Sequence, residues 1–259
     1  MPDAGYNSKI EQLLKPAVTS GLTDNDSAIC YALLAKKRKS NMSRILKRVI
    51  DLVIAFVSLV ILSPLLIICI LVLLCTGEHE IFFLQKRVGY KNQLFNIIKF
   101  ATMLKNSPNM GTGEITLRND PRVTRFGKIL RMTKLNELPQ IFNVLTGDMS
   151  IVGPRPLMSV SFKQYPEEVQ RVIYNCKPGM TGLGSLIFRD EEKIVSEADD
   201  PKAMYKKIYE YKWALEIWYQ EHESFATDFK IIFLTAWSII FPSNKLVYRF
   251  FKSLPPRPL

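Results

Sequence analysis

The feature that most constrains this chain is an apolar segment at residues 49–75, VIDLVIAFVSLVILSPLLIICILVLLC. It contains one charged residue, Asp51, close to its beginning. An unbroken helix of this length would cross a bilayer, since about 20 residues suffice. Ser63-Pro64 lies in the middle, however, and proline removes a backbone hydrogen bond and clashes with the preceding turn. A break there leaves arms of roughly 14 and 11 residues, and neither alone spans a hydrocarbon core about 30 Å thick.

The basic residues that flank this segment bear on whether the helix spans the membrane or re-enters it. Those upstream are Lys36, Lys37, Arg38, Lys39, Arg44, Lys47 and Arg48, and those downstream are Lys86, Arg87 and Lys91. A spanning helix normally shows a clear asymmetry of Lys and Arg, whereas both flanks are basic here. We therefore predict that residues 44–76 enter the membrane, bend at Ser63-Pro64 and leave on the same face. A kinked spanning anchor remains the alternative.

Composition narrows the class of partner. The formal net charge of +11 and the pI near 9.4 favour an anionic partner. We expect no nucleic-acid ligand, because the basic residues are spread along the chain and lipid and phosphate account for them. The four cysteines form no C-x-x-C pair and there are only two histidines, which argues against a zinc site or a disulfide framework. Residues 1–43 form a polar extension in which we expect no signal peptide.

Beyond residue 76 the pattern is that of an α+β domain that is predominantly helical. Residues 81–88 and 94–100 predict a β-hairpin around a Gly- and Asn-containing loop. Helices are predicted at 125–132, from about 165 onward and at 204–220, and turns at 152–156 and 177–182. The apolar run at 229–241 is too short to span a bilayer and predicts either a core helix or an amphipathic interfacial helix.

The stretch at residues 134–156, KLNELPQIFNVLTGDMSIVGPRP, has the pattern of a capped helix. The apolar stripe consists of Leu138, Ile141, Phe142 and Leu145. Pro139 would then lie in the first turn, Asn136 at or near the N-cap, and Glu137 at the first helical position. Gly147 would end the helix. Nothing in this pattern by itself requires catalysis.

The same geometry also suits phosphate binding, because free N–H groups and partial positive charge gather at a helix N-terminus. Arg131 precedes the stretch and Arg155 lies in its last turn, where arginine forks suit phosphate oxygens. Glu137 and Asp148 could hold a divalent cation that a diphosphate bridges. The residues alone leave the structural and the functional interpretation open.

Several motifs together resemble the bacterial sugar transferases, the monotopic phosphoglycosyl transferases of polysaccharide and glycoconjugate assembly. In that family the stretch at 134–156 usually runs L-D-E-L-P-Q-x-x-N-V-L-x-G-D-M-S-x-V-G-P-R-P. RVIDLVIAFVSLVILSP is similar to the re-entrant membrane helix of the family, and FFLQKRVGYKNQLFNIIKFATM to its F-x-Q-x-R-x-G segment followed by K-F-R-T-M. KPGMTG resembles its P-G-x-T-G turn. The resemblance covers residues 44–241.

The resemblance implies an enzyme at the cytosolic face of the bacterial inner membrane, with residues 77–259 as the catalytic domain and an interfacial C-terminal helix. It would transfer a sugar-1-phosphate from a UDP-sugar to polyprenyl (undecaprenyl) phosphate, using Mg²⁺. Membrane lipid is a further partner, and a homodimer is left open. By motif match, position 136 and Glu137 form the catalytic pair and Glu137 binds the metal. The residues matched to phosphate or nucleotide roles are Arg131, Asp148, Arg155 and Arg189.

Two positions depart from the family pattern. Asn136 stands where the family has the nucleophilic aspartate, and a neutral amide cannot attack phosphorus as a carboxylate does. Ala101 stands in place of the family's arginine. The main hypothesis is a transferase without the aspartyl intermediate, in which polyprenyl phosphate attacks directly or Glu137 is the nucleophile. The alternatives are an inactive relative that regulates or scaffolds the pathway, and an Asn136 introduced artificially into an ordinary enzyme.

Overall fold

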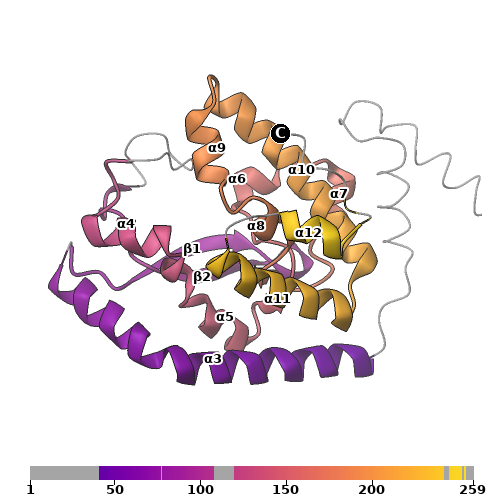
Figure 1. The fold of residues 1–259 in the computed structure, drawn as a ribbon, viewed down its shortest axis with the longest axis horizontal. Coiled ribbons are helices and arrows are strands. Elements are labelled where there is room, and N and C mark those ends of the chain that lie inside the picture. Colours follow the sequence, from indigo (N-terminus) through magenta and orange to yellow (C-terminus); the bar gives the residue numbers. More distant parts are fainter. Residues whose placement is uncertain (1–40, 77, 108–119, 242–244, 253, 255–259) are drawn as a thin grey trace, which may run out of the picture.

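The computed structural model describes residues 41–76, 78–107, 120–241, 245–252 and 254, so almost all of the predicted extension at 1–43 lies outside the described residues. Most of the described chain is helical, as expected (Figure 1). The helices are α3 (Asn41–Cys75), α4 (Arg125–Met132), α5 (Gln140–Thr146), α6 (Ser159–Phe162), α7 (Glu167–Val172), α8 (Leu183–Ile187), α9 (Glu191–Glu197), α10 (Pro201–His222), α11 (Phe225–Ile240) and α12 (Lys245–Phe250). The strands are β1 (Phe82–Val88), β2 (Leu94–Phe100), β3 (Ser150–Val152) and β4 (Gly179–Thr181), and the 3₁₀ turns are η2 (Tyr90–Asn92) and η4 (Leu135–Glu137).

The apolar segment forms most of the long helix α3, which continues through Pro64. The prediction of two separate arms is wrong in this respect, although Figure 1 shows the helix bending in its C-terminal half. Pro64 has no N–H to donate to the carbonyl four residues earlier, that of Val60. The Ser63 hydroxyl donates to this carbonyl instead, at 2.8 Å. The hydroxyl thus keeps the carbonyl bonded at the bend, and the helix need not end there.

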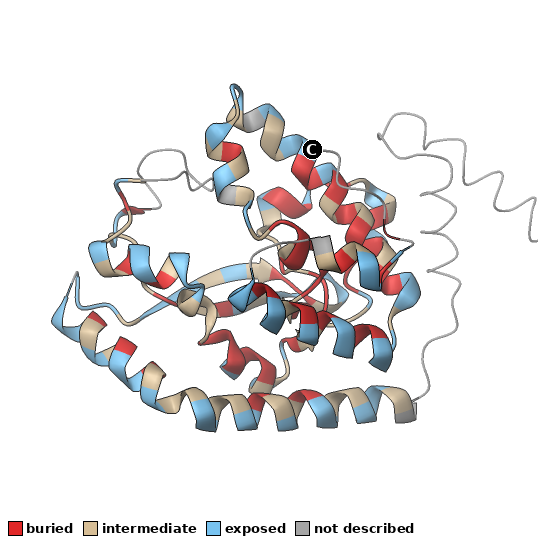
Figure 2. Cartoon of the chain, in the orientation of Figure 1, coloured by how far each residue is buried: buried red, intermediate tan, exposed pale blue. Residues whose placement is uncertain are grey.

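The apolar surface of α3 is largely uncovered. In Figure 2 the helix carries mainly exposed and intermediate residues, and only 17% of its most apolar window is buried. By length and hydropathy, the part from Ser43–Cys75 is sufficient to cross a membrane. A core helix of this hydropathy would be mostly buried, so the exposed face requires another apolar environment. The choice between re-entrant and spanning geometry stays a prediction.

The N-terminal part of α3 is fastened to the rest of the molecule by charged side chains. Arg48 donates to the carbonyls of Val144 and Leu145, at 2.6 and 3.0 Å, and so binds the C-terminal end of α5. Asp51 is only 5% exposed and accepts from the Ser150 hydroxyl at 2.7 Å. The one charge in the apolar segment is therefore an anchor to β3.

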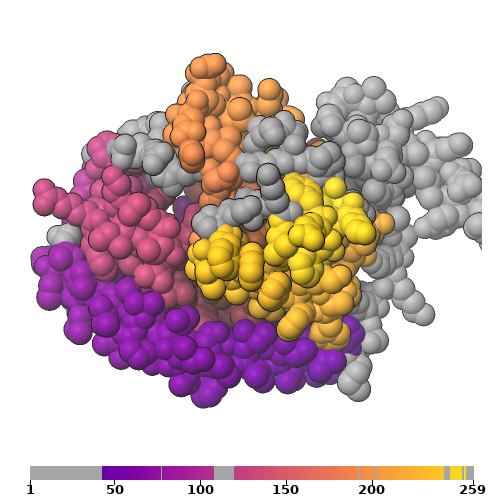
Figure 3. All heavy atoms as spheres, in the orientation of Figure 1, coloured from indigo at the N-terminus to yellow at the C-terminus, as the bar shows by residue number. Residues whose placement is uncertain are grey.

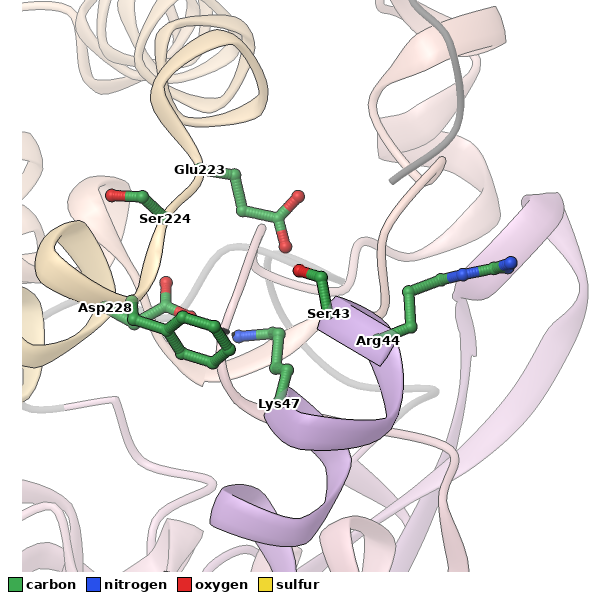
Figure 4. Close-up of a pocket in the computed structure, with 7 residues that line it drawn as sticks. Ser43, Arg44, Lys47, Glu223, Ser224 and Asp228 are labelled. Carbon is green, nitrogen blue, oxygen red and sulfur yellow. Dashed lines mark hydrogen bonds and ion pairs between the residues drawn. The ribbon is translucent and has the colours of Figure 1, made fainter. Parts of the chain in front are cut away.

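A second fastening joins α3 to α11. Lys47 Nζ lies 2.5 Å from Asp228 Oδ2, and Figure 4 shows the two side chains pointing toward one another at the edge of a cavity of about 210 Å³. The space-filling view shows α3 along one flank of the molecule with α11 beside it (Figure 3). These contacts fix the position of α11 relative to the N-terminal part of α3.

The predicted β-hairpin is confirmed. Strands β1 and β2 pair antiparallel from Phe82↔Phe100 to Val88↔Leu94, and the connection contains η2. A parallel pair that the sequence did not predict joins β3 to β4, with Ser150 opposite Gly179 and Val152 opposite Thr181. The segments at 152–156 and 177–182, both predicted as turns, thus contain strand residues and lie side by side.

The helix predicted at 204–220 is the central part of α10, around which α7, α8 and α9 pack. The run predicted as a core or interfacial helix at 229–241 falls mainly in α11. One face of α11 buries Ile231 and Leu234, while Phe229, Phe233 and Trp237 on other faces are exposed. The core alternative is confirmed for one face of α11, and the interfacial role of its exposed aromatic face stays a prediction.

Candidate active site

The helix start at residues 134–140 differs from its predicted form. Lys134 adopts a left-handed conformation, with φ 61°, and opens η4, which contains Asn136 and Glu137. Helix α5 begins only at Gln140, with Pro139 as its N-cap, so the prediction of Asn136 as the cap and Glu137 as the first α-helical residue is wrong. The predicted end is confirmed, since Gly147 follows α5 with φ 96°. The side-chain oxygen of Asn136 is buried and has no hydrogen-bond partner.

Glu137 lies between two cations. Arg155 Nη2 is 2.7 Å from Glu137 Oε1, and Lys99 Nζ is 3.3 Å from the same oxygen. Arg155 Nη1 also approaches Glu137 Oε2, at 3.5 Å, and donates to the Ser185 hydroxyl at 3.3 Å. The arrangement gathers residues from β2, η4, the turn after β3 and α8.

The pKa values in this cluster follow from burial and neighbouring charge. Burial alone would raise the pKa of Glu137, but Arg155 and Lys99 hold the pKa well below its usual range. Burial lowers the pKa of Lys99 to about 8, against the attraction of Glu137. Glu137 raises the pKa of Arg155. At neutral pH one carboxylate therefore faces two cations, and the excess positive charge suits an anionic ligand.

Lys99 reaches Glu137 because α5 is bound to β2. The Asn143 side chain accepts from the backbone N–H of Ile98, at 2.9 Å, and donates to the carbonyl of Asn96, at 2.8 Å. Asn143 is buried, and both ends of its amide are satisfied. This contact fixes the start of α5 beside the end of β2, where Lys99 lies.

Arg155 is held through its backbone. The carbonyl of Arg155 accepts from the Tyr174 hydroxyl at 2.9 Å, and its N–H points to Glu216 Oε1 at 3.5 Å. The preceding turn packs closely on β4, since a Cβ added to Gly153 would lie 2.3 Å from the carbonyl oxygen of Lys177. Glycine is therefore required where these two segments meet.

The other residues predicted for the site have different partners, although α4, which carries Arg131, packs against η4. Asp148 is exposed and follows the C-terminal end of α5, where it accepts from the Thr146 hydroxyl at 2.8 Å. Glu137 precedes the other end of α5, roughly 15 Å away at 1.5 Å per residue. The two carboxylates therefore cannot hold one cation together. Arg189 donates to the Ser238 hydroxyl of α11 at 3.3 Å, and Arg131 lies on α4 near the Asp120 carboxylate.

The donors at the site fit Mg²⁺ only if a ligand supplies most of the coordination. Among the described residues, no group of three or more His, Cys, Asp or Glu side chains could hold a metal. Mg²⁺ commonly takes one or two protein carboxylates and completes its shell with water and substrate phosphates. Glu137 supplies one carboxylate, and the unpartnered amide oxygen of Asn136 is a second oxygen donor. They fit an ion that is bound together with a diphosphate.

The structure brings together Glu137 and Arg155, both of which the sequence predicted for the site. The sequence did not predict Lys99, Ser185 and Glu216 beside them. A signal existed for Lys99, since it is the only charged residue in the strand LFNIIKF. Ser185 and Glu216 carried no comparable signal, because α8 and α10 bring them to Arg155 only in the folded chain.

Residues 42–242 match the family described as bacterial sugar transferase. The chain belongs to this family. It is 35% identical to the undecaprenyl-phosphate galactose phosphotransferase of Salmonella typhimurium, over 83% of this chain and 45% of that protein. It is 34% identical to the UDP-glucose:undecaprenyl-phosphate glucose-1-phosphate transferase of Escherichia coli, over 76% of this chain and 41% of that protein. The chain spans less than half the length of these two relatives.

A shorter relative is covered almost completely. The chain is 33% identical to the uncharacterized sugar transferase EpsL of Bacillus subtilis, over 76% of this chain and 88% of that protein. This chain therefore covers most of the Bacillus subtilis protein but less than half of the other two. The activities named above are those of the two longer proteins.

Proposed function

We propose that this chain transfers a sugar-1-phosphate from a UDP-sugar to polyprenyl phosphate at the cytosolic face of the bacterial inner membrane, as the first step of a polysaccharide or glycoconjugate. The observation that carries the proposal is the ionised Glu137 between Arg155 and Lys99, in a domain fastened to an exposed apolar helix. The names of the relatives support the substrate classes, a nucleotide sugar and undecaprenyl phosphate.

Arg155 and Lys99 can neutralise the negative charge of the phosphate groups that take part in phosphoryl transfer. An oxygen of polyprenyl phosphate would attack the sugar-bearing phosphorus of the donor. The bond from that phosphorus to the bridging oxygen would break, and UMP would leave with the electron pair. Arg155 and Lys99 would hold the diphosphate oxygens, where positioning and neutralisation supply most of the catalysis. Mg²⁺, held by Glu137 and the Asn136 oxygen, would neutralise further phosphate charge.

Direct transfer is favoured over a covalent intermediate on Glu137. Both oxygens of Glu137 face the Arg155 guanidinium, and the pKa of the carboxyl is held low. A carboxylate stabilised in this way is a weak nucleophile. Asn136 offers an amide oxygen, which can bind a cation but cannot form the acyl phosphate.

The test is UMP release by the purified chain in nanodiscs with polyprenyl phosphate, Mg²⁺ and a panel of UDP-sugars. We expect turnover by the wild type with at least one donor and loss of turnover in Glu137→Gln. Turnover should produce no sugar-phosphate adduct on the protein. A covalent adduct on Glu137, detected by mass spectrometry, would rule out direct transfer.

The amide at position 136 also supports a second candidate, an inactive relative that binds nucleotide sugar or lipid and regulates the pathway. Asn136→Asp distinguishes the two. If the wild type releases no UMP with any donor while Asn136→Asp does, the chain is a binding protein and the transfer proposal fails. If the wild type turns over and Glu137→Gln does not, the second candidate is excluded.

A further inference from the structure

Glu216 on α10 is a buried carboxyl that the proposed chemistry does not use. It is 4% exposed, and its Oε2 is buried without a hydrogen-bond partner. Its Oε1 lies 3.5 Å from the backbone nitrogen of Arg155, at the outer limit of a hydrogen bond. A buried acid with one unused oxygen calls for an explanation, because an apolar residue would fill the same space at lower cost.

The carboxyl also fits against the helix that carries Ser185. A Cβ added to Gly184 would lie 2.8 Å from Glu216 Oε1, so the glycine leaves the space that the carboxyl occupies. Gly184 precedes Ser185, whose hydroxyl accepts from Arg155 Nη1. Glu216 thus contacts the backbone of Arg155 on one side and the start of α8 on the other. These are two of the elements that build the candidate site.

We propose that Glu216 is a positioning residue for this site. Its uncharged carboxyl contacts the backbone of Arg155 and the start of α8 and holds both in place, and its ionisation weakens the binding of the diphosphate. The inference takes its ligand, a diphosphate, from the proposed function. The geometry, in which a buried acid contacts the backbone of Arg155, is independent of that function.

The surroundings of Glu216 favour the uncharged form. Its Oε2 has no donor to stabilise a negative charge, and burial raises the pKa of Glu216 to about 8, with Arg155 and Lys212 acting in the opposite direction. The titratable or charged groups around it are Arg155, Lys212, Tyr165, Tyr174 and Cys176. Lys212 is itself paired with Glu191, at 2.6 Å, and Tyr174 is bonded to the Arg155 carbonyl.

Ionisation would change the site in two ways. A negative charge would appear behind Arg155 and offset part of the positive field that the diphosphate meets. The charged carboxylate would also attract Lys212, which donates to Glu191, and so compete with that ion pair. Both effects reduce affinity for an anion as the pH passes the pKa of Glu216.

The test measures binding of inorganic pyrophosphate by calorimetry, using the full chain in nanodiscs at pH 7 and pH 9. With a pKa near 8, only about one tenth of Glu216 is uncharged at pH 9. Between these pH values the wild-type affinity should therefore fall about tenfold more than that of Glu216→Gln, which cannot ionise. The titration of the probe and of Lys99 is common to both proteins and cancels in the comparison.

Two further variants complete the design. Glu210→Gln changes an exposed glutamate of the same helix and should retain the wild-type profile. Glu216→Met is uncharged but cannot accept from Arg155, so it should bind several-fold more weakly than Glu216→Gln at pH 7. The inference fails if the profiles of Glu216→Gln and wild type superimpose, or if Glu216→Met binds as well as Glu216→Gln.

A measurement on the wild type decides the matter if the variants do not fold. Infrared spectroscopy at pH 7 should show a protonated carboxyl stretch that disappears with a midpoint near pH 8, and its absence would overturn the inference. The result is also separable from the proposed function. Pyrophosphate binding needs no turnover, so a chain that releases no UMP still tests Glu216.

Discussion

Asn136 and Glu137 are adjacent in sequence, but their side chains differ in the number of hydrogen-bond and ion-pair partners. Glu137 is bonded to Arg155 and Lys99, whereas the oxygen of Asn136 is buried without a donor. An unpartnered buried carbonyl usually costs about 1–3 kcal/mol. The position is the one that the motif resemblance assigns to a nucleophilic aspartate, and a ligand bound there would supply the missing partner.

Replacement of Arg155 tests whether the cation acts on the reacting phosphates. We expect Arg155→Met to lower the rate of UMP release by roughly 10²–10³-fold, since an aimed donor at developing charge is worth about that much. Arg155→Lys should recover part of the rate, because it keeps the charge but loses the fork. The matched control is Arg171→Met on α7, whose ion pair with Glu167 is exposed. A rate for Arg155→Met within a few-fold of the control would contradict the assignment.

Glu216 also makes the stability of the fold depend on pH. Its folded pKa of about 8 exceeds the unfolded value of about 4.3, so the folded state binds the extra proton in between. The contribution of the uncharged form is therefore fully present below about pH 4 and is lost as the pH rises through 8. As the pH rises from 5 to 8, the unfolding midpoint of Glu216→Gln should increase relative to that of the wild type. A constant difference across this range would show that Glu216 does not titrate as stated.

At the scale of single residues, the sequence could predict site residues only where a local motif and a charge point to the same position. Glu137 and Arg155 were predicted for one site because motif and charge coincide at both positions, and the structure places them in contact. Lys99 could not be placed beside Glu137, because their contact depends on the Asn143 amide that joins α5 to β2. Asp148 was predicted close to Glu137, and α5 separates them. Pairing across elements is a tertiary property that residue spacing does not encode.

At the scale of elements, long periodic segments were predicted well and short ones were not. The hairpin follows from two β-favourable runs around a Gly- and Asn-containing loop, and α10 follows from a helical period over many residues. Strands β3 and β4 have only three residues each, and both lie in or beside stretches rich in glycine and proline, which predicted turns. The start of α5 was placed too early because η4 places Asn136 and Glu137 in a separate turn. The bend of α3 was predicted as a break because the Ser63 bond to Val60 could not be foreseen.

The topology of α3 can be measured with single cysteines at positions 48 and 80, in a background from which the four native cysteines have been removed. We predict that a membrane-impermeant thiol reagent labels both positions from the same, cytoplasmic, face. The physical reason is that both flanks of the helix are basic and that Arg48 and Asp51 fasten its beginning to the polar domain. Arg48→Cys breaks one fastening, so position 44 serves as a second reporter. Labelling from opposite faces would establish a spanning helix.

The whole molecule presents exposed apolar side chains on both α3 and α11. The exposed aromatic side chains of α11 include Phe229, Phe233 and Trp237. Trp favours the level of the lipid headgroups, and Phe is typical of the apolar face of an interfacial helix. The prediction of an interfacial C-terminal helix therefore places α11 at the membrane surface beside α3.

A triple replacement of Phe229, Phe233 and Trp237 by serine should lower the share of protein that floats with vesicles after mild alkaline or high-salt washing. Helix α3 is retained, so complete release is not expected. The control replaces three exposed polar residues, Lys206, Lys207 and Glu210 of α10, by serine. Equal flotation of the triple variant and the control would exclude α11 from the membrane surface.

Helix α5 has a mechanical consequence. Its C-terminal end is bound by Arg48 of α3, and Glu137 lies just beyond its other end. Seven helical residues measure about 10 Å, and α5 packs along α3, where Ile141 and Val144 share a buried cluster with Ala55. The helix therefore sets the distance between the Arg48 contact and Glu137. Insertion of one turn into α5 would displace Glu137 relative to α3 without altering any residue of the site.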